Sequence, residues 1–234
     1  MYSIKNRVTT SYCGSDGCMK LYSALLLMQD CSELWIESEP DYQRFFIENN
    51  MAQLLASRQV EVIRKPKYKE ELTVTTSVYD MTPMYGFRNT FIYDADGKVC
   101  YKSYSIGAFV DMVNKRLHRI DEDVIKTITI DDKLDMNYRE RRISIPKTES
   151  KQCHPIDILR SDIDYNSHVN NVSYTRMALD LLPNDFEPRE MRVEYKSQTR
   201  FGDTLQPMVY AIDNGYVVVL MANGQVCTIV EFLA

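Results

Sequence analysis

A helical pattern of apolar residues follows a dense run of polar residues in the last third of the chain. The apolar positions recur at spacings of three and four residues, which places them on one face of a helix. Pro183 marks the end of this pattern, because proline does not continue a helix. The pattern predicts an amphipathic helix whose entrance carries the polar run 160–173. Its apolar face consists of Tyr174, Met177, Ala178, Leu181 and Leu182.

The first half of the chain shows a comparable order of elements. Loose alternation from Tyr2 to Tyr12, rich in Thr, Val and Tyr, predicts an antiparallel strand. The run from Met19 to Met28 is apolar on most sides, which is typical of a helix buried in a core. The segment from Pro40 to Ser57 has a weaker helical pattern and predicts a second, shorter helix.

From Arg58 to Asp111 the periodicity changes to the two-residue alternation of β-strands. Asp96-Gly97, which lies between two alternating runs, indicates a β-hairpin. This half therefore predicts a strand, a helix and an antiparallel meander. The region 114–152 then becomes polar and charged, and it predicts a linker laid over the surface.

The second half of the chain repeats the first. Segment 60–72 aligns position by position with segment 193–205, without a gap. Further on, 95–100 matches 222–227, so the first copy is slightly longer between the two aligned segments. Self-similarity of whole units indicates a duplication.

The duplication predicts two α+β modules, each with a curved antiparallel sheet wrapped around one central helix. We expect an N-terminal module over residues 1–128, a linker over 129–150 and a C-terminal module over 151–234. We also expect the two sheets to join through their edges, because unpaired edge strands favour pairing.

Composition and charge narrow the class of protein. Hydrophobic residues make up 44% of the chain and charged residues 26%, which is typical of a globular protein. The net charge of −5 argues against a nucleic-acid partner. No apolar run is long enough to cross a membrane, and the first residues lack the apolar core of a signal peptide. We therefore expect a cytoplasmic protein with no membrane partner.

The cysteines and the common cofactor motifs give little support to other chemistry. The six cysteines are scattered without a CxxC pair, so we expect reduced thiols rather than disulfides or a zinc site. For Cys153-His154, next to the polar run, we expect neither a nucleophilic nor a metal-binding role. The sequence contains no GxGxxG, no GKS/GKT phosphate loop, no HExxH and no GxSxG. We therefore expect no cofactor and no metal.

The polar run itself carries the candidate chemistry. Asp and Asn residues before an apolar run are often only caps and turns. His168, one of three histidines in the chain, is harder to explain as loop decoration. A helix entrance presents unpaired N–H groups and a partial positive charge, which suit a developing oxyanion. A carboxylate, an amide and an imidazole beside it predict carbonyl chemistry.

The segment DIDYNSHVNN resembles the signature of the acyl-acyl-carrier-protein thioesterases of plants and bacteria. Segments 54–74, YGFRNTFIYDADGK, FVDMVNKRLHRI and EYKSQTRFGDTL resemble other parts of that family in the same order, so the resemblance covers nearly the whole chain. It implies a tandem (double) hotdog fold. It also implies hydrolysis of fatty acyl-acyl-carrier-protein to free fatty acid and carrier protein in fatty acid biosynthesis, by residues of the second hotdog.

The resemblance assigns four catalytic positions. Asp164, Asn166 and His168 match the Asp-x-Asn-x-His of the family. Gln198 stands where the plant enzymes usually have Glu. This departure matters because a carboxylate accepts a proton from water, whereas a neutral amide only orients water through hydrogen bonds.

From this match we hypothesise how the work is divided. Asp164 or His168 activates the water, and Gln198 positions it. Asn166 polarises the thioester carbonyl together with backbone N–H groups near Val169 and Asn170.

The implied partner is the acyl carrier protein, which is acidic. A negatively charged enzyme therefore needs a local basic patch to bind it. An acyl-CoA thioesterase and a non-catalytic acyl-binding module remain alternatives, and a monomer and a homodimer are equally compatible. The candidate basic residues are Arg64, Lys65, Lys67 and Lys69, or Arg139, Arg141 and Arg142.

Overall fold

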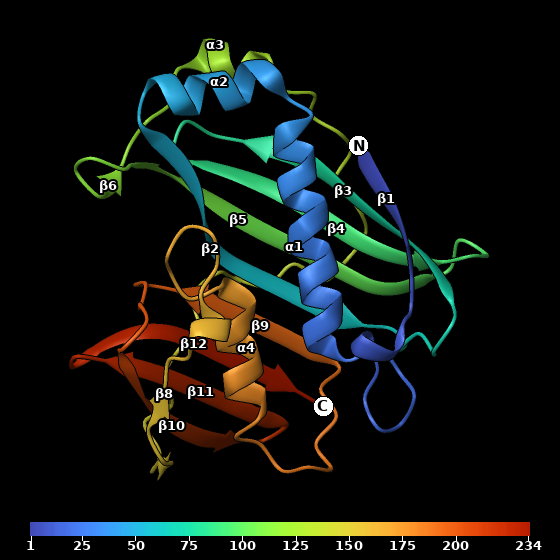
Figure 1. Ribbon diagram of the computed structural model, residues 1–234, viewed down its shortest axis with the longest axis vertical. Coiled ribbons are helices and arrows are strands. Elements are labelled where there is room, and N and C mark those ends of the chain that lie inside the picture. The colour runs from blue at the N-terminus through green and yellow to red at the C-terminus, as the bar shows by residue number, and fades with distance from the viewer. The chain divides into compact units, whose positions relative to one another are not determined.

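The computed structural model describes residues 1–234, which divide into two compact units. The first comprises Met1–Ala56 and Val62–Tyr138, and the second comprises Ser57–Glu61 and Arg139–Ala234. In each unit a helix lies against one face of an antiparallel sheet (Figure 1). This is the predicted α+β module, formed twice. None of the helices combines the length and the apolarity that crossing a bilayer requires.

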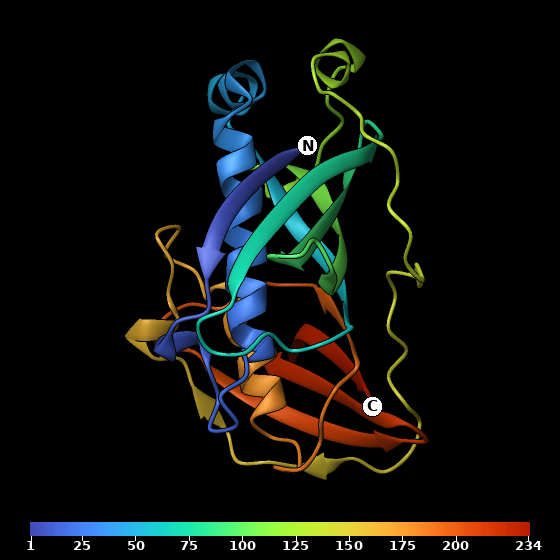
Figure 2. The same cartoon turned by 90° about the vertical axis from the view of Figure 1, so that its right-hand side faces the viewer.

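The first unit is built around one long helix. Strands β1, β3, β4 and β5 are neighbours in that order and all pair antiparallel. Helix α1 lies across them (Figure 1), and β1 and β3 curve past it (Figure 2). The elements are β1 (Tyr2–Arg7), η1 (Thr10–Tyr12), α1 (Leu21–Glu37), α2 (Pro40–Glu48), β2 (Met51–Val62), β3 (Glu71–Met81), β4 (Tyr85–Asp94), β5 (Val99–Asp111), β6 (Arg116–Leu117) and α3 (Glu122–Lys126).

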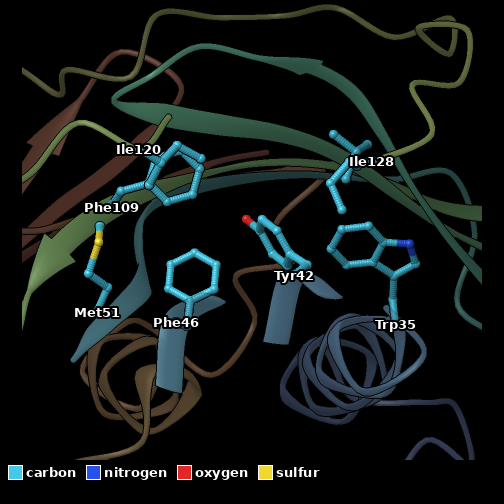
Figure 3. Packing of buried hydrophobic residues seen from close by; sticks show 8 residues of the cluster. Trp35, Tyr42, Phe46, Met51, Phe109, Ile120 and Ile128 are labelled. Carbon is cyan, nitrogen blue, oxygen red and sulfur yellow. The ribbon is translucent and has the colours of Figure 1, made fainter. Parts of the chain in front are cut away.

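Helix α1 is the predicted core helix, and it continues to Glu37. Most of its apolar residues from Leu21 to Met28 are buried, and Cys31 and Trp35 extend the buried face by two turns. The far end of α1 packs into an aromatic cluster (Figure 3). The cluster consists of Trp35, Tyr42, Phe46, Met51, Val78, Phe109, Ile120 and Ile128.

The second predicted helix is correct only in its first part. Helix α2 ends at Glu48, and the chain from Met51 is strand β2, so the helix prediction for 51–57 is wrong. The reversal occurs at Asn50, which has a φ of 52°. Asparagine tolerates this left-handed conformation, which ends a helix. The predicted first strand is also shorter than expected, because β1 ends at Arg7.

The second unit repeats the plan with a shorter helix. Residues Ser57–Glu61 of β2 pair with β9, and the sheet continues through β12, β11, β10 and β7. Helix α4 lies against this sheet (Figure 1). The elements are β7 (Lys151–Gln152), β8 (Ile156–Asp157), η2 (Arg160–Asp162), α4 (Asn171–Leu179), β9 (Glu190–Tyr195), β10 (Thr204–Ile212), β11 (Gly215–Ala222) and β12 (Gln225–Leu233).

The second unit has a tight turn at the position that matches the predicted Asp96-Gly97 hairpin of the first. Asn223 and Gly224 join β11 to β12 with φ values of 51° and 75°. Two positive φ values in a two-residue loop define the hairpin turn that Asn-Gly favours. In the first unit, Gly97 donates to the carbonyl oxygen of Asp94 at 3.1 Å in the corresponding turn.

The polar region 114–152 contains short elements that its pattern did not predict, namely β6, α3 and β7. Its middle part is held to the first unit by the buried side chain of Asn89. The Asn89 Oδ1 accepts from the Leu134 amide at 3.1 Å and from the Tyr138 hydroxyl at 2.9 Å. A segment without regular structure is thus fixed by one buried amide.

The chain after Tyr138 is fixed to the second unit by ion pairs. Arg139 Nη1 donates to Glu190 at 2.8 Å and to Glu231 at 2.7 Å. Arg192 binds the same Glu231 through two bonds of 2.8 Å. Because Arg139 already pairs with two carboxylates, its charge is largely neutralised. Arg139 is therefore a poor candidate for attracting a partner protein.

Candidate active site

The three family-motif residues lie in one tight loop between η2 and α4. The loop is closed by two backbone bonds, from the Asp164 amide to the His168 carbonyl (2.9 Å) and from the Ser167 amide to the Asp164 carbonyl (3.0 Å). Ser167 has a φ of 62°, so the chain reverses at that residue. Asp164, Asn166 and His168 are therefore held together by the loop's own backbone.

The two acids of the polar run have different tasks. Asp162 is buried, accepts from the Leu159 amide at 2.9 Å and pairs with Arg176 at 2.8 Å. It is a structural residue. Asp164 is half-buried, and its Oδ1 accepts from the Asn166 amide at 2.9 Å. Its other oxygen accepts no hydrogen bond from the protein, so one oxygen shapes the loop while the other remains free for chemistry.

The entrance of α4 is capped as the sequence predicts. The Asn170 Oδ1 accepts from the Val172 amide at 2.9 Å. The expectation that the amides near Val169 and Asn170 polarise a carbonyl is wrong for those two residues. Val169 donates to the Thr199 carbonyl (3.1 Å) and Asn170 to the Asp162 carbonyl (2.8 Å). The first helical amide, that of Asn171, donates to no protein group.

The segment that carries Gln198 lies beside the loop, because the residue after Gln198 is anchored from two sides. The bond from Val169 to Thr199 joins the loop to the chain that follows β9. On the other side the Thr199 amide donates to the Tyr174 hydroxyl of α4 at 2.9 Å, and the two hydroxyl groups lie 2.7 Å apart. Burial raises the pKa of Tyr174, so its hydroxyl stays protonated. Gln198 itself is exposed.

Three of the candidate side chains are uncommitted. The side chains of Asn166, His168 and Gln198 form no hydrogen bond or ion pair with the rest of the protein. Polar groups at a helix entrance that are held by backbone bonds, yet keep their own side chains free, suit the binding of a polar ligand. The site therefore has the groups needed to bind a carbonyl and a water molecule.

Two matches to known protein families establish the family of this chain. The chain matches the acyl-ACP thioesterase N-terminal domain over residues 1–128 and the acyl-ACP thioesterase C-terminal domain over residues 145–224. The chain belongs to the acyl-ACP thioesterase family.

Individual relatives agree with this assignment. The chain is 26% identical over 170 residues to FATB3, a chloroplastic acyl-(acyl-carrier-protein) hydrolase of Cuphea viscosissima, and this match covers 68% of the chain. It spans only 41% of the length of that relative.

Two solved structures share the fold over 99% of the chain and 96% of their own. An acyl-ACP thioesterase from Bacteroides thetaiotaomicron matches with a TM-score of 0.89 at 20% identity. The 12:0-ACP thioesterase from Umbellularia californica matches with a TM-score of 0.88 at 12% identity. These likenesses confirm the tandem hotdog fold.

The duplicated fold of the chain holds a second copy of the candidate active-site loop. Residues 12–20 repeat the backbone bonds of residues 162–170, position by position. The matching bonds run from Gly14 to Cys18 (2.8 Å), from Gly17 to Gly14 (3.1 Å), from Lys20 to Tyr12 (2.9 Å) and from Met19 to Pro66 (2.7 Å).

In the first copy, the side chains at the positions equivalent to Asn166 and Gln198 contact one another. Asp16 occupies the position of Asn166, and Lys65, by the alignment of 60–72 with 193–205, occupies that of Gln198. Asp16 and Lys65 form an ion pair at 3.3 Å. Side chains at these two positions therefore reach one another.

The first copy lacks the groups that hydrolysis needs. A glycine and a cysteine stand where the second copy has a carboxylate and an imidazole. The candidate catalytic side chains therefore occur together only in the second copy of the loop. The equivalent pairs are Gly14 and Asp164, and Cys18 and His168.

The cysteines and the remaining polar side chains form no further cluster at this site. The Cys153 thiol contacts only the Lys151 carbonyl, at 3.9 Å, and His154 is exposed. All six cysteines are free thiols, and no group of three His, Cys, Asp or Glu residues is arranged to hold a metal ion. Sequence reasoning missed Tyr174 and Thr199, because nothing in their spacing signals that they fix Gln198.

Proposed function

We propose that this chain hydrolyses fatty acyl thioesters of acyl carrier protein, releasing free fatty acid and carrier protein in fatty acid biosynthesis. The family assignment supports the reaction class. The observation that carries the proposal is the loop in which Asp164, Asn166 and His168 lie beside the segment of Gln198, with three of these four side chains uncommitted.

The reaction requires a base, a positioned water molecule and an oxyanion site. His168 accepts a proton from water, whose oxygen attacks the thioester carbon and forms the new C–O bond. When the C–S bond breaks, the same proton passes from His168 to the leaving sulfur. Asp164 places a negative charge in the same loop, which offsets the positive charge that the imidazole gains.

The oxyanion site lies at the entrance of α4. The amide N–H of Asn171 is available there, at the positive end of the helix dipole. The side-chain amide of Asn166 supplies a second donor. Asn171 replaces the amides of Val169 and Asn170, both of which are used by the backbone.

Gln198 orients the water molecule. Its carbonyl oxygen accepts a hydrogen bond from water, and this fixes the direction of attack without removing a proton. The base is therefore a residue of the loop rather than Gln198. This division differs from a mechanism in which Glu stands at position 198 and can itself take a proton.

The direct test is thiol release from thioesters of acyl carrier protein and of CoA, over a series of chain lengths. The proposal expects turnover, with higher kcat/KM for carrier-protein thioesters than for CoA thioesters of the same chain. Binding of acyl thioesters without any thiol release would contradict it and favour an acyl-binding module. Equal or higher kcat/KM for CoA thioesters would assign the substrate to CoA.

A further inference from the structure

Exposed apolar side chains gather around the loop of the second unit. Tyr165, within the loop, is 87% exposed, and Leu159, at its entrance, is 58% exposed. Phe201, two residues after the anchored Thr199, is 57% exposed. The bond from Val169 to Thr199 joins the two segments that carry them. Large exposed apolar side chains that cluster in this way mark interaction sites.

Two arginines accompany these side chains. The guanidinium of Arg160 lies 5.4 Å from the ring centroid of Phe201, so η2 and the segment after β9 touch at this point. Arg160 and Arg200 are both exposed, and neither forms an ion pair. Both charges are therefore available to a partner.

Arg64 and Lys65, two of the basic residues that the sequence offered for this task, are less suitable. Arg64 binds Glu70 and Asp94, each at 2.7 Å, and Lys65 binds Asp16 at 3.3 Å. Pairing neutralises these cations locally. In a chain with a net charge of −5, attraction of an acidic protein requires unpaired cations, and Arg160 and Arg200 meet this condition beside the candidate site.

We propose that Leu159, Arg160, Tyr165, Arg200 and Phe201 form the docking surface for the acidic carrier protein, and we call this set the loop patch. The proposal rests on the proposed function. The carrier delivers its thioester on an arm of limited length, so it must dock within the reach of that arm from the loop that holds His168. Aromatic and arginine side chains are the residue types that dominate protein interfaces. The two arginines steer the acidic surface, and the apolar side chains are covered by it.

The duplication provides a matched control surface. Lys67 and Tyr68 are the counterparts of Arg200 and Phe201 in the alignment of the two copies. Tyr68 is 49% exposed, and the ammonium of Lys69 lies 5.3 Å from its ring centroid. This surface has similar chemistry but stands beside a loop that lacks the catalytic groups. It should not contribute to docking.

The test compares Arg160→Glu/Arg200→Glu with Lys67→Glu/Lys69→Glu on three substrates of one chain length. These are the carrier-protein thioester, the CoA thioester and the N-acetylcysteamine thioester. We expect the loop-patch variant to raise KM for the carrier-protein thioester by about tenfold or more. Its kcat/KM for the other two substrates should stay within about twofold of wild type. Phe201→Ser should raise the same KM without reversing a charge.

Three outcomes would overturn the proposal. Loss of N-acetylcysteamine thioester hydrolysis to the same extent would show that the arginines shape the site instead. An equal rise in KM for the CoA thioester would show that they bind the phosphates of the arm. A larger effect of the Lys67 and Lys69 variant on the carrier KM would place docking at the first copy. Absence of all hydrolysis in wild type would count against the proposed function and is distinguishable from these results.

Discussion

The amide of Val169 donates to the carbonyl oxygen of Thr199 at 3.1 Å. Each partner is the residue directly after a candidate catalytic residue, because Val169 follows His168 and Thr199 follows Gln198. This one backbone bond therefore joins the two segments that carry the imidazole and the amide. The first copy has the same bond, from Met19 to Pro66, at 2.7 Å. The first copy thus keeps this backbone bond although it lacks the candidate catalytic side chains.

Tyr174→Phe tests whether this scaffold positions Gln198. The variant removes the hydroxyl that binds the amide and the side chain of Thr199, and it leaves a buried donor unsatisfied. We expect a loss of about 1–3 kcal/mol in the free energy of unfolding. We also expect a fall in kcat with little change in KM, because the water molecule is held less firmly. Denaturant unfolding and steady-state kinetics measure the two effects.

Tyr101→Phe is the matched control for Tyr174→Phe. The Tyr101 hydroxyl is buried and donates to the Met19 carbonyl at 3.3 Å in the first copy. This variant should lose stability but keep its kcat. If the two variants lowered kcat to the same degree, the effect of Tyr174 would be one of general stability and the positioning role would be lost.

Gln198→Glu tests the role of the neutral amide. A carboxylate at this position can accept a proton from water, so the variant should remain active and gain a new ionisation in its pH profile. Its kcat/KM should rise as pH increases through about 4.3, the ordinary pKa of Glu. Gln198→Ala should lower kcat by about tenfold to a hundredfold, because the water molecule loses the hydrogen bond that orients it. Lys65→Ala changes the equivalent position of the first copy. This variant should leave kcat and kcat/KM unchanged.

How far the sequence predicts this molecule depends on the range of the interactions. The first turns of helix α1, the β-meander and the Asp96-Gly97 hairpin follow from local periodicity and turn chemistry, and these predictions are confirmed. The error over 51–57 arose because the apolar spacing of Leu54 and Leu55 fits a helix or a strand. The choice is made by pairing partners distant in sequence, such as Glu194 opposite Ser57.

The candidate site shows the same limit. Asp164, Asn166 and His168 are close in sequence, so their grouping was predictable. The choice of oxyanion donor was not, because the amides of Val169 and Asn170 are taken by carbonyls that only the folded chain brings near. Tyr174 likewise has the sequence pattern of an ordinary core residue. Its hydroxyl can position the segment of Gln198 only because the fold brings Thr199 next to it.

The ion pair between Arg64 and Glu70 predicts a pH dependence of stability. The Arg64 guanidinium holds the pKa of Glu70 below its usual range. A carboxyl whose pKa is lower in the folded state stabilises the fold above its unfolded pKa of about 4.3 and loses this contribution as pH falls. We therefore expect the melting temperature of wild type to fall more steeply between about pH 5 and pH 3 than that of Glu70→Gln.

The control for this pH dependence is Glu71→Gln. Glu71 forms an exposed ion pair with Arg7 at 3.2 Å, and such pairs contribute little to stability. Its melting curve should follow that of wild type at each pH. Equal slopes for wild type and Glu70→Gln would show that the Arg64 pair contributes nothing to acid sensitivity.

The most direct test of the account is the turnover of a carrier-protein thioester by His168→Ala and by Cys18→Ala, the same substitution at equivalent positions of the two loops. The account predicts that His168→Ala lowers kcat by more than about a hundredfold and that Cys18→Ala keeps it within about twofold. Both variants should unfold at the wild-type denaturant concentration, because neither side chain supports the fold through a strong contact. Activity of His168→Ala within about threefold of wild type would contradict the assignment of the reaction to this loop.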